Sequence, residues 1–98
     1  MPRYKVIITP EALADLASIH AYIAKDSTDN AARMAERILD AIDGLAEMPE
    51  RFSIVRTQRK LPYQLRKVVV RPYKVFYSIE HQAVFVRTVR HAARRPWP

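Results

Sequence analysis

Two stretches in the second half of the chain, residues 73–79 and 83–91, show a period-two alternation along the sequence. Alternation of β-branched and aromatic residues with other types is typical of strands whose two faces meet different surroundings. Residues 68–70 form a third run, which is apolar and β-branched. The connections between the runs are only two or three residues long, and short connections favour antiparallel neighbours. The pattern therefore predicts a three-stranded antiparallel meander.

The alternation also predicts which side chains share a face of this sheet. One face, expected to lie against the core, carries Tyr73, Val75, Tyr77 and Ile79. In the last run, Val84, Val86 and Thr88 point one way, whereas Phe85, Arg87, Val89 and His91 point the other way. On the face opposite the tyrosines we expect a group of aromatic and basic side chains suited to contact nucleic acid, namely Lys74, Phe76, Phe85, Arg87 and His91.

The first half of the chain predicts one strand and one helix at its start. Residues 4–9 are typical of a strand. Thr9 can cap a helix and Pro10 suits the first helical position, so we expect a helix from there to about residue 25. Its predicted buried stripe is Leu13, Leu16, Ile19 and Ile23.

A second amphipathic helix is expected over residues 30–47, before Pro49 ends the pattern. Its predicted stripe is Ala31, Ala35, Ile38, Leu39, Ile42, Leu45 and Ala46. The four-residue connection predicts an antiparallel hairpin, and Phe52 is expected to anchor the irregular segment that follows. Each helix has a single apolar stripe and needs a sheet to cover it. We therefore predict an α+β fold, in the order β-α-α-β-β-β, with the helical hairpin packed on a small, largely antiparallel, twisted sheet.

The composition limits the class of protein. The 98 residues predict a single domain, 1–98. The absence of cysteine excludes disulfides, thiolate zinc sites and cysteine nucleophiles, and it fits a cytoplasmic location. We expect no membrane association, because no apolar run approaches the ~20 residues of a membrane helix and the N-terminus does not have the length of a signal peptide.

The charge is distributed very unevenly. Residues 1–50 hold five Lys or Arg and nine Asp or Glu, a formal charge of −4, and residues 51–98 hold twelve Lys or Arg and one acid, Glu80, a formal charge of +11. The sheet side is therefore predicted to be basic. Nucleic acid, a ribonucleoprotein or an acidic protein segment are the partners that this charge favours.

His91 is the histidine best placed for chemistry, because Arg90, Arg94 and Arg95 surround it in the sequence. An imidazole with an ordinary pKa near ~6.5 suits either proton-transfer role. The alternative is a strand-end histidine that bonds only to the backbone. His20 and His81 are expected to be surface or boundary residues. No pair of histidines has a clustered carboxylate or thiol partner, so we expect no metal and no cofactor.

Several markers, in a fixed order, carry a resemblance to a known superfamily. They are Thr9-Pro10, Ala14-Asp15-Leu16, Ile19, Tyr22, Ala31-Ala32, Ile42, Leu45, Met48-Pro49, Arg51-Phe52, the run 73–77 and the run 89–95. In this order they resemble the RelE/ParE superfamily of bacterial toxins from type II toxin–antitoxin pairs. The resemblance covers nearly the whole chain. The long second helix and the basic tail after the last strand look more like the ParE branch.

The resemblance implies one of three functions. Members similar to ParE poison DNA gyrase by binding, which is the function that we favour here. Members similar to RelE cut messenger RNA on the ribosome, as metal-independent enzymes. A third alternative is an inactive homologue that only binds its antitoxin. In each case the resemblance implies a cognate antitoxin, and the +11 half of the chain favours an acidic segment in it.

The alternatives place function on different residues. RNA cleavage needs a base, an acid and cations for the developing charge. The RNase candidates are His91, Lys74, Arg71, Arg90 and Arg94. Lys74 stands where the RNases of the superfamily carry an arginine, so Arg71 or Arg66 would have to supply the bidentate guanidinium contact. The arginine that these RNases carry on the last strand corresponds in position to about Ala92, which cannot replace it. For binding of the target or the antitoxin, the candidates are Arg66, Lys67, Arg87, Arg94, Arg95 and Trp97, with Trp97 between prolines as a stiff anchor.

Overall fold

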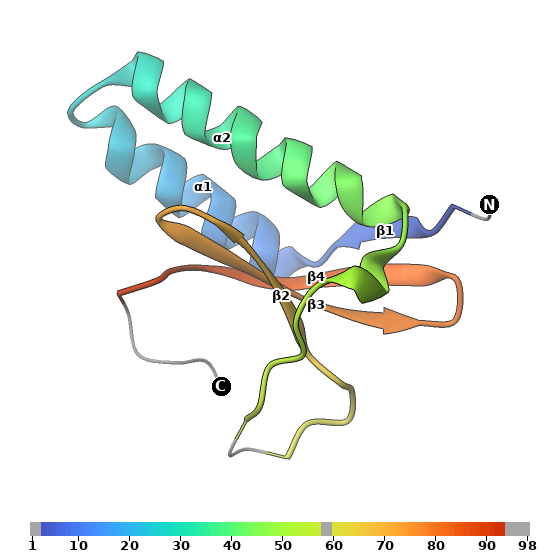
Figure 1. Cartoon of the computed structure of the whole chain (residues 1–98). Helices are drawn as coiled ribbons and strands as arrows, with labels where there is room; N and C mark the ends of the chain where they lie inside the picture. The colour runs from blue at the N-terminus through green and yellow to red at the C-terminus, as the bar shows by residue number, and fades with distance from the viewer. Residues whose placement is uncertain (1–2, 58–59, 94–98) are drawn as a thin grey trace.

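Two antiparallel helices cover one face of a four-stranded mixed sheet (Figure 1). The computed structural model describes residues 3–57 and 60–93. The elements are β1 (Lys5–Ile8), α1 (Pro10–Ala24), α2 (Thr28–Asp43), β2 (Arg66–Val70), β3 (Tyr73–Glu80) and β4 (Ala83–His91), with short 3-10 turns at Gly44–Ala46 and Pro49–Arg51. The predicted α+β class and element order are confirmed.

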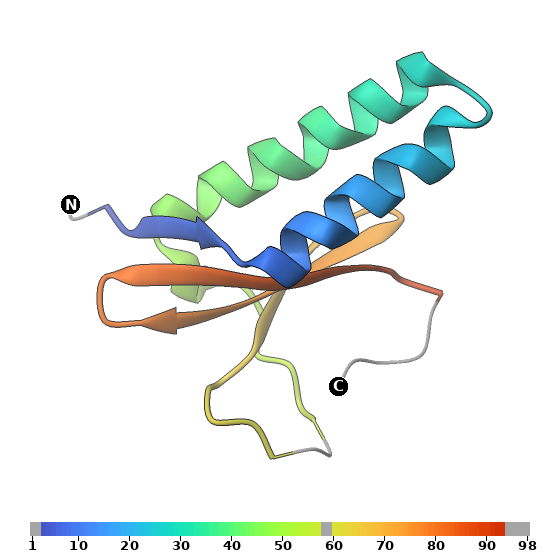
Figure 2. The same ribbon diagram turned by 180° about the vertical axis from the view of Figure 1, so that it is seen from behind.

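The sheet has the strand order β1-β4-β3-β2. The predicted meander of β2, β3 and β4 is antiparallel, as expected from its short connections. β1 adds to the other edge of β4 in parallel, with Lys5 opposite Ala83 and Ile8 opposite Val86. Figure 2 shows β1 beside β4, with α1 leaving from the end of β1. β4 is therefore an inner strand, bonded on both sides over its first half.

Thr9 joins the sheet to α1. Its hydroxyl accepts the Ala12 N–H at 3.3 Å and donates to the Val86 carbonyl at 2.7 Å. Pro10 takes the first helical position, as predicted, where its missing N–H costs nothing. One side chain thus caps the helix and holds it beside β4.

The buried stripes of the helices differ from the predicted ones at two leucines. Leu13 is 59% exposed and Leu39 is 42% exposed, whereas their neighbours Ala12 and Ile38 are fully buried. Successive helical side chains point about 100° apart, so a rotation of α1 about its axis brings Ala12 into the core in place of Leu13, whereas Leu39 lies at the margin of a stripe that Ile38 occupies as predicted. The second helix also ends at Asp43, earlier than predicted, although Leu45 remains buried in the 3-10 turn that follows.

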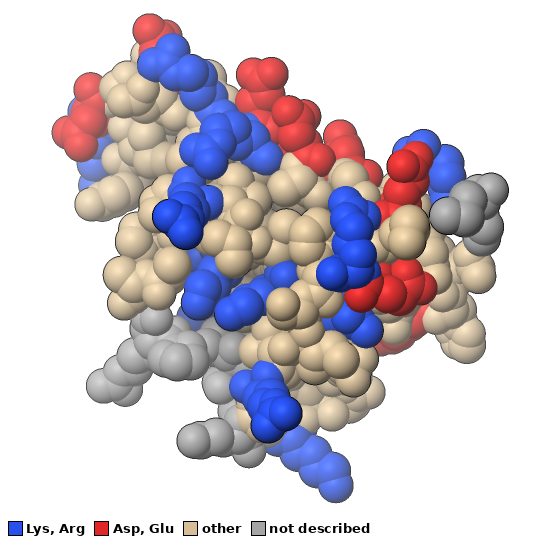
Figure 3. Space-filling view, viewed as in Figure 1, with Lys and Arg blue, Asp and Glu red and all other residues tan. Residues whose placement is uncertain are grey.

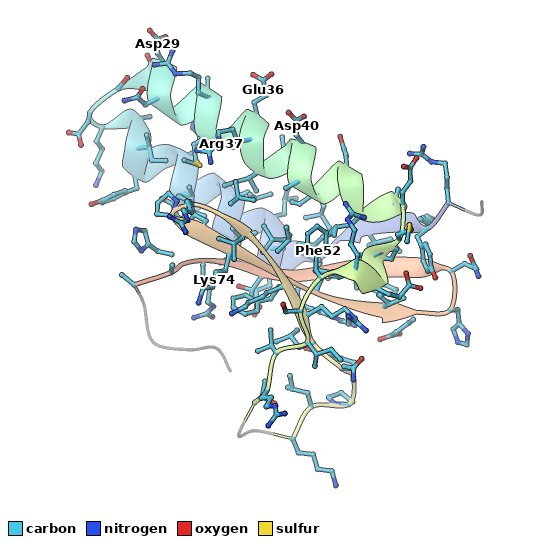
Figure 4. The ribbon with its side chains drawn as sticks, viewed as in Figure 1. Asp29, Glu36, Arg37, Asp40, Phe52 and Lys74 are labelled. Atoms are coloured by element: carbon cyan, nitrogen blue, oxygen red, sulfur yellow. The ribbon has the colours of Figure 1, made fainter. Side chains whose placement is uncertain are left out.

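The segment between α2 and β2 is held to the sheet by hydrogen bonds from the side chains of Tyr77 and Arg66, by backbone hydrogen bonds with Leu65 and Lys67, and by one ring. The Tyr77 hydroxyl donates to the Pro49 carbonyl at 2.6 Å. The Arg66 guanidinium donates to the carbonyls of Glu50 and Phe52 at 2.9 and 2.7 Å. Phe52 itself packs against the core, as predicted, beneath α2 (Figure 4). These contacts fix the path of an otherwise irregular stretch.

A β-bulge in β4 changes which side chains share a face. Phe76 pairs with Thr88 but Tyr77 pairs with Val86, so Arg87 is an extra residue in β4. Side chains after such an insertion move to the opposite face. Val89 is therefore buried opposite Val75, on the core side. The predicted face that combined Phe85, Arg87, Val89 and His91 is wrong beyond Arg87, because simple alternation has no place for the extra residue.

Within the described residues, no helix is long and apolar enough to cross a membrane.

Substitution of Tyr77 tests the contact with Pro49. Burial raises the pKa of the Tyr77 hydroxyl to about 12 from the usual 10.0. Tyr77→Phe leaves the buried Pro49 carbonyl without its donor and is expected to lower the free energy of unfolding at pH 7 by about 1–3 kcal/mol. Urea unfolding measures this loss, and Tyr22→Phe at a side chain that is largely exposed is the control.

Wild type and Tyr77→Phe together also test the ionisation of the Tyr77 hydroxyl. The unfolded tyrosine loses its proton near pH 10 and the folded one near pH 12, so the contribution of the neutral hydroxyl is complete below pH 10 and falls as the pH rises to 12. The stability difference between wild type and Tyr77→Phe should therefore shrink over this range. A difference that stays constant from pH 9 to pH 12 would contradict the assignment.

Candidate functional site

A hollow of about 640 Å³ lies between α1 and the end of β4. Its lining includes Asp15, Tyr22, Tyr73, Val89, Arg90 and His91. The hollow forms because β1 pairs only with residues 83–86 of β4, so the last residues of β4 have no strand on that side. It brings together two of the predicted RNase candidates, Arg90 and His91, with the exposed ring of Tyr22.

His91 lies at the end of β4, on the helix side of the sheet. Its register partner is Tyr73, and the two rings meet edge to face with centroids 5.3 Å apart and an interplanar angle of 81°. Its Nδ1 accepts the Ala93 N–H at 3.0 Å. The ring is therefore oriented by an aromatic neighbour and by the backbone that follows it, which leaves Nε2 available to other groups.

Asp15 of α1 binds the open edge of β4. Its carboxylate accepts the Val89 N–H at 3.0 Å and the Thr88 hydroxyl. Arg90 Nε in turn donates to the Thr88 hydroxyl oxygen at 3.3 Å. Just after the bulge, this carboxylate supplies the acceptor that a neighbouring strand would otherwise offer to the Val89 N–H. Asp15 lies outside the buried stripe predicted for the first helix, and the sequence pattern gives it no role there, because a contact with a residue 74 positions away leaves no local signal.

Lys74 lies on the opposite face of the sheet from His91. Its neighbours Tyr73 and Val75 are buried against the helices, so the alternation of β3 directs Lys74 away from them. Figure 4 shows its side chain on the far side of the sheet from α1 and α2. The structure therefore does not place the predicted RNase pair, His91 and Lys74, on one surface.

The Arg87 side chain is engaged in contacts with other residues of the chain. Its guanidinium donates to Ser78 Oγ and to Glu80 Oε1, both at 2.9 Å. It also stacks over the rings of Tyr63 and Phe85, at 4.1 and 5.1 Å from their centroids. Phe76, another member of the predicted nucleic-acid face, is only 6% exposed. Together with the displacement of His91, this contradicts the predicted aromatic and basic surface.

The other predicted residues within the described part of the chain are not among those that line the hollow. Arg66 is occupied by the two carbonyls that it holds, Lys67 lies on the same face of the sheet as Lys74, and Arg71 is exposed in the β2–β3 turn. Arg94, Arg95 and Trp97 lie outside the described residues.

The acidic side chains gather on the helix side, whereas the basic side chains are more widely spread. In Figure 3 Asp and Glu lie mainly along the helices and the turn that follows them, whereas Lys and Arg extend from the helices over the sheet to the loop below it. Asp29, Glu36 and Asp40 point outward from α2, away from the sheet (Figure 4). No group of three or more potential metal ligands is present among residues 3–57 and 60–93.

Removal of the Asp15 carboxylate tests the contact at the β4 edge. Asp15→Ala leaves the Val89 N–H and the buried Thr88 hydroxyl without an acceptor, and it should destabilise the fold by ~1–3 kcal/mol. Urea unfolding gives this value, and amide exchange at Val89 should become faster. Asp40→Ala on the outer face of α2 is the matched control. Equal stability of the two variants would show that the contact contributes nothing.

Comparison with known sequences identifies the family. The family described as "ParE toxin of type II toxin-antitoxin system, parDE" matches residues 6–96. Toxin RelE2 of Caulobacter vibrioides is 43% identical over 91 residues, which cover 92% of this chain and 97% of the relative. Putative toxin Y4kP of Sinorhizobium fredii is 36% identical over 100 residues, with 100% and 97% covered.

Solved structures show the same fold at lower sequence identity. A chain of the chromosomal ParDE system of P. aeruginosa superposes with a TM-score of 0.73 at 14% identity, with 93% of this chain and 98% of that chain covered. A chain of the toxin–antitoxin complex RelBE2 of Mycobacterium tuberculosis gives 0.67 at 23% identity, with 96% and 97% covered. From the family match and the relatives, the chain belongs to the ParE toxin family of type II toxin–antitoxin systems, within the RelE/ParE superfamily.

Proposed function

We propose that this toxin inhibits growth by binding DNA gyrase, that it does not cut RNA, and that a cognate antitoxin neutralises it in the cytoplasm. The observation that carries this proposal is the separation of His91 from Lys74 by the sheet. Cleavage by 2′-hydroxyl attack requires a proton acceptor, a proton donor and cations around one phosphate. Lys74, on the opposite face of the sheet, is not placed to act on a phosphate bound beside His91.

Two further observations support binding as the mode of action. The family that matches residues 6–96 is that of the ParE toxins, whose branch the resemblance links to gyrase. Arg66, one possible source of the bidentate contact that an RNase would need, is engaged with the carbonyls of Glu50 and Phe52. A binding toxin has no such requirement, because it needs only a complementary surface and an anchor.

The antitoxin part of the proposal rests on related complexes and on charge. The similar structures come from ParDE and RelBE systems, and the RelBE2 structure is that of a toxin–antitoxin complex. The charge of +11 on residues 51–98 favours an acidic partner and would accelerate association. The partner inferred for this chain is thus an antitoxin with an acidic segment.

One observation favours the second candidate, a ribosome-dependent endoribonuclease. Arg90 and His91 line the same hollow, and Nε2 of His91 is available there. The relative at 43% identity is named Toxin RelE2. In this alternative His91 would transfer a proton and Arg90 would stabilise charge, with Arg71 or Arg94 as further cations.

A gyrase assay tests the proposal. Purified toxin is incubated with gyrase, ATP and plasmid, and linear DNA is quantified after protein digestion. Wild type should increase linear DNA. Deletion of residues 94–98, which removes Trp97 and two arginines, should raise the required concentration by about tenfold or more, the scale expected for loss of an aromatic anchor.

His91→Ala is the matched variant in this assay, because it changes a side chain beside the tail and leaves the tail intact. It should act within about twofold of wild type, and circular dichroism should show that both variants are folded. Failure of wild type to increase linear DNA or to inhibit supercoiling would contradict the gyrase proposal.

A further inference from the structure

The outward face of α1 carries almost no charge. Between Glu11 and Lys25 the sequence contains a single Asp, Glu, Lys or Arg, which is Asp15, and its carboxylate is turned to the β4 edge. A surface helix normally carries charged side chains on the side away from the core. The neighbouring helix α2 does so, with Asp29, Arg33, Glu36, Arg37, Asp40 and Asp43. The outward face of α1 therefore has the composition of a contact surface.

Large apolar side chains are exposed beside this face. On α1, Leu13 is 59% exposed and Tyr22 is 70% exposed, and on α2 Leu39 is 42% exposed. A small, mainly apolar groove of about 50 Å³ lies between the two helices, and its lining includes Leu16, Ile19, His20 and Leu39. Figure 2 shows α1 on the outer side of the molecule, with the sheet behind it. Exposed apolar surface of this kind is typical of a contact with another protein.

Charge argues against the other expected partners at this face. An acidic antitoxin segment would find one cation here, Lys25, whereas residues 51–98 carry a formal charge of +11. Nucleic acid is bound through several cations along a surface, which α1 does not offer. A partner for α1 must therefore present an uncharged apolar surface of its own, and a second copy of α1 presents one.

The two ends of α1 carry opposite charges. Glu11 lies in the first turn and Lys25 is the C-cap residue, and both are exposed. They are 14 residues apart, which is ~3.9 turns and ~21 Å, so both lie on the same side of the helix. When two α1 helices pack antiparallel about a two-fold axis beside Ser18, Glu11 of each copy lies opposite Lys25 of the other. A parallel arrangement would bring like charges together.

The middle of the face allows two helices to pack closely. Ala14, Ala17 and Ala21 are exposed at three- and four-residue spacing, so they lie on one side of α1. Such short side chains allow helix axes to approach to the lower end of the usual ~8–10 Å. In the antiparallel arrangement, Leu13 of each copy packs against residues 20–24 of the other, beside the groove that Leu39 lines. Each copy contributes the same patch, as a two-fold symmetric interface requires.

We propose that two copies of the free toxin associate through α1, antiparallel about a two-fold axis beside Ser18, with contacts between Glu11 and Lys25 at both ends. Because α1 lies between its own sheet and this contact, the basic halves of the two copies are held apart. The dimer thus leaves the basic half of each copy accessible to other partners. The inference goes beyond the proposed function and does not depend on the target.

The test measures self-association of the whole purified toxin by sedimentation velocity over a range of concentrations. Ala17→Glu brings carboxylates of the two copies together beside the axis, and it should raise the dissociation constant of the dimer by about tenfold or more. Ala17 is exposed, so the monomer should keep its fold, which circular dichroism checks. Gln82→Glu, in the exposed turn between β3 and β4, makes the same change in net charge and should stay within about twofold of wild type.

Reversal of the end charges tests the orientation of the helices. Glu11→Lys and Lys25→Glu each place like charges together at both ends of the contact, and each should weaken the dimer by about threefold or more. The double variant Glu11→Lys/Lys25→Glu restores opposite charges at both ends and keeps the net charge of wild type. It should return to within about twofold of the wild-type dissociation constant.

Three results would overturn the inference. A wild-type toxin that stays monomeric at every concentration would remove the dimer, and weaker binding of the cognate antitoxin to Ala17→Glu in titration calorimetry would then assign the face to the antitoxin. Self-association that Ala17→Glu leaves unchanged would place the contact on another surface. A double charge variant that associates as weakly as the single ones would contradict the antiparallel arrangement. The gyrase assay tests the proposed function independently of all three results.

Discussion

Two local features determine on which surfaces the polar groups of this toxin lie: the extra residue Arg87 in β4, and the Asp15 carboxylate that binds β4 just beyond it. β4 is paired on both sides up to Val86, and Arg87 then interrupts the ladder with β3. Asp15 accepts the Val89 N–H at the edge that β1 leaves open. The bulge turns Val89 into the core and directs His91 to the helix side. The placement of His91 in the hollow, on the face opposite Lys74, follows from this local change of register.

The sheet separates two surfaces with different properties. The helix side holds the aromatic pair of Tyr73 and His91 beside α1, with the acidic outer face of α2 beyond it. The other side carries Lys67 and Lys74 around the exposed side chain of Val69. A toxin that works by binding must meet both its target and its antitoxin. Under the proposed function, these two chemically distinct surfaces would serve the two contacts.

Much of the fold could be predicted from the sequence, because its signals are local. Thr9 and Pro10 start α1, the short connections fix the meander, and the alternation of β3 places Tyr73, Val75 and Tyr77 in the core. The candidate site was harder to predict. A bulge has no marker in alternation, so Val89 and His91 were assigned to the wrong face. The roles of Asp15, Arg66 and Arg87 depend on contacts between distant segments, which neither composition nor spacing reveals.

The central claim, that this toxin binds its target and does not cut RNA, is tested most directly in a cell-free translation reaction. Purified toxin is added, and the 5′ ends of the messenger RNA are mapped by primer extension. The proposed function predicts an intact message, because the sheet separates His91 from Lys74. Discrete new ends within codons that disappear with His91→Ala would contradict the claim and identify an endoribonuclease.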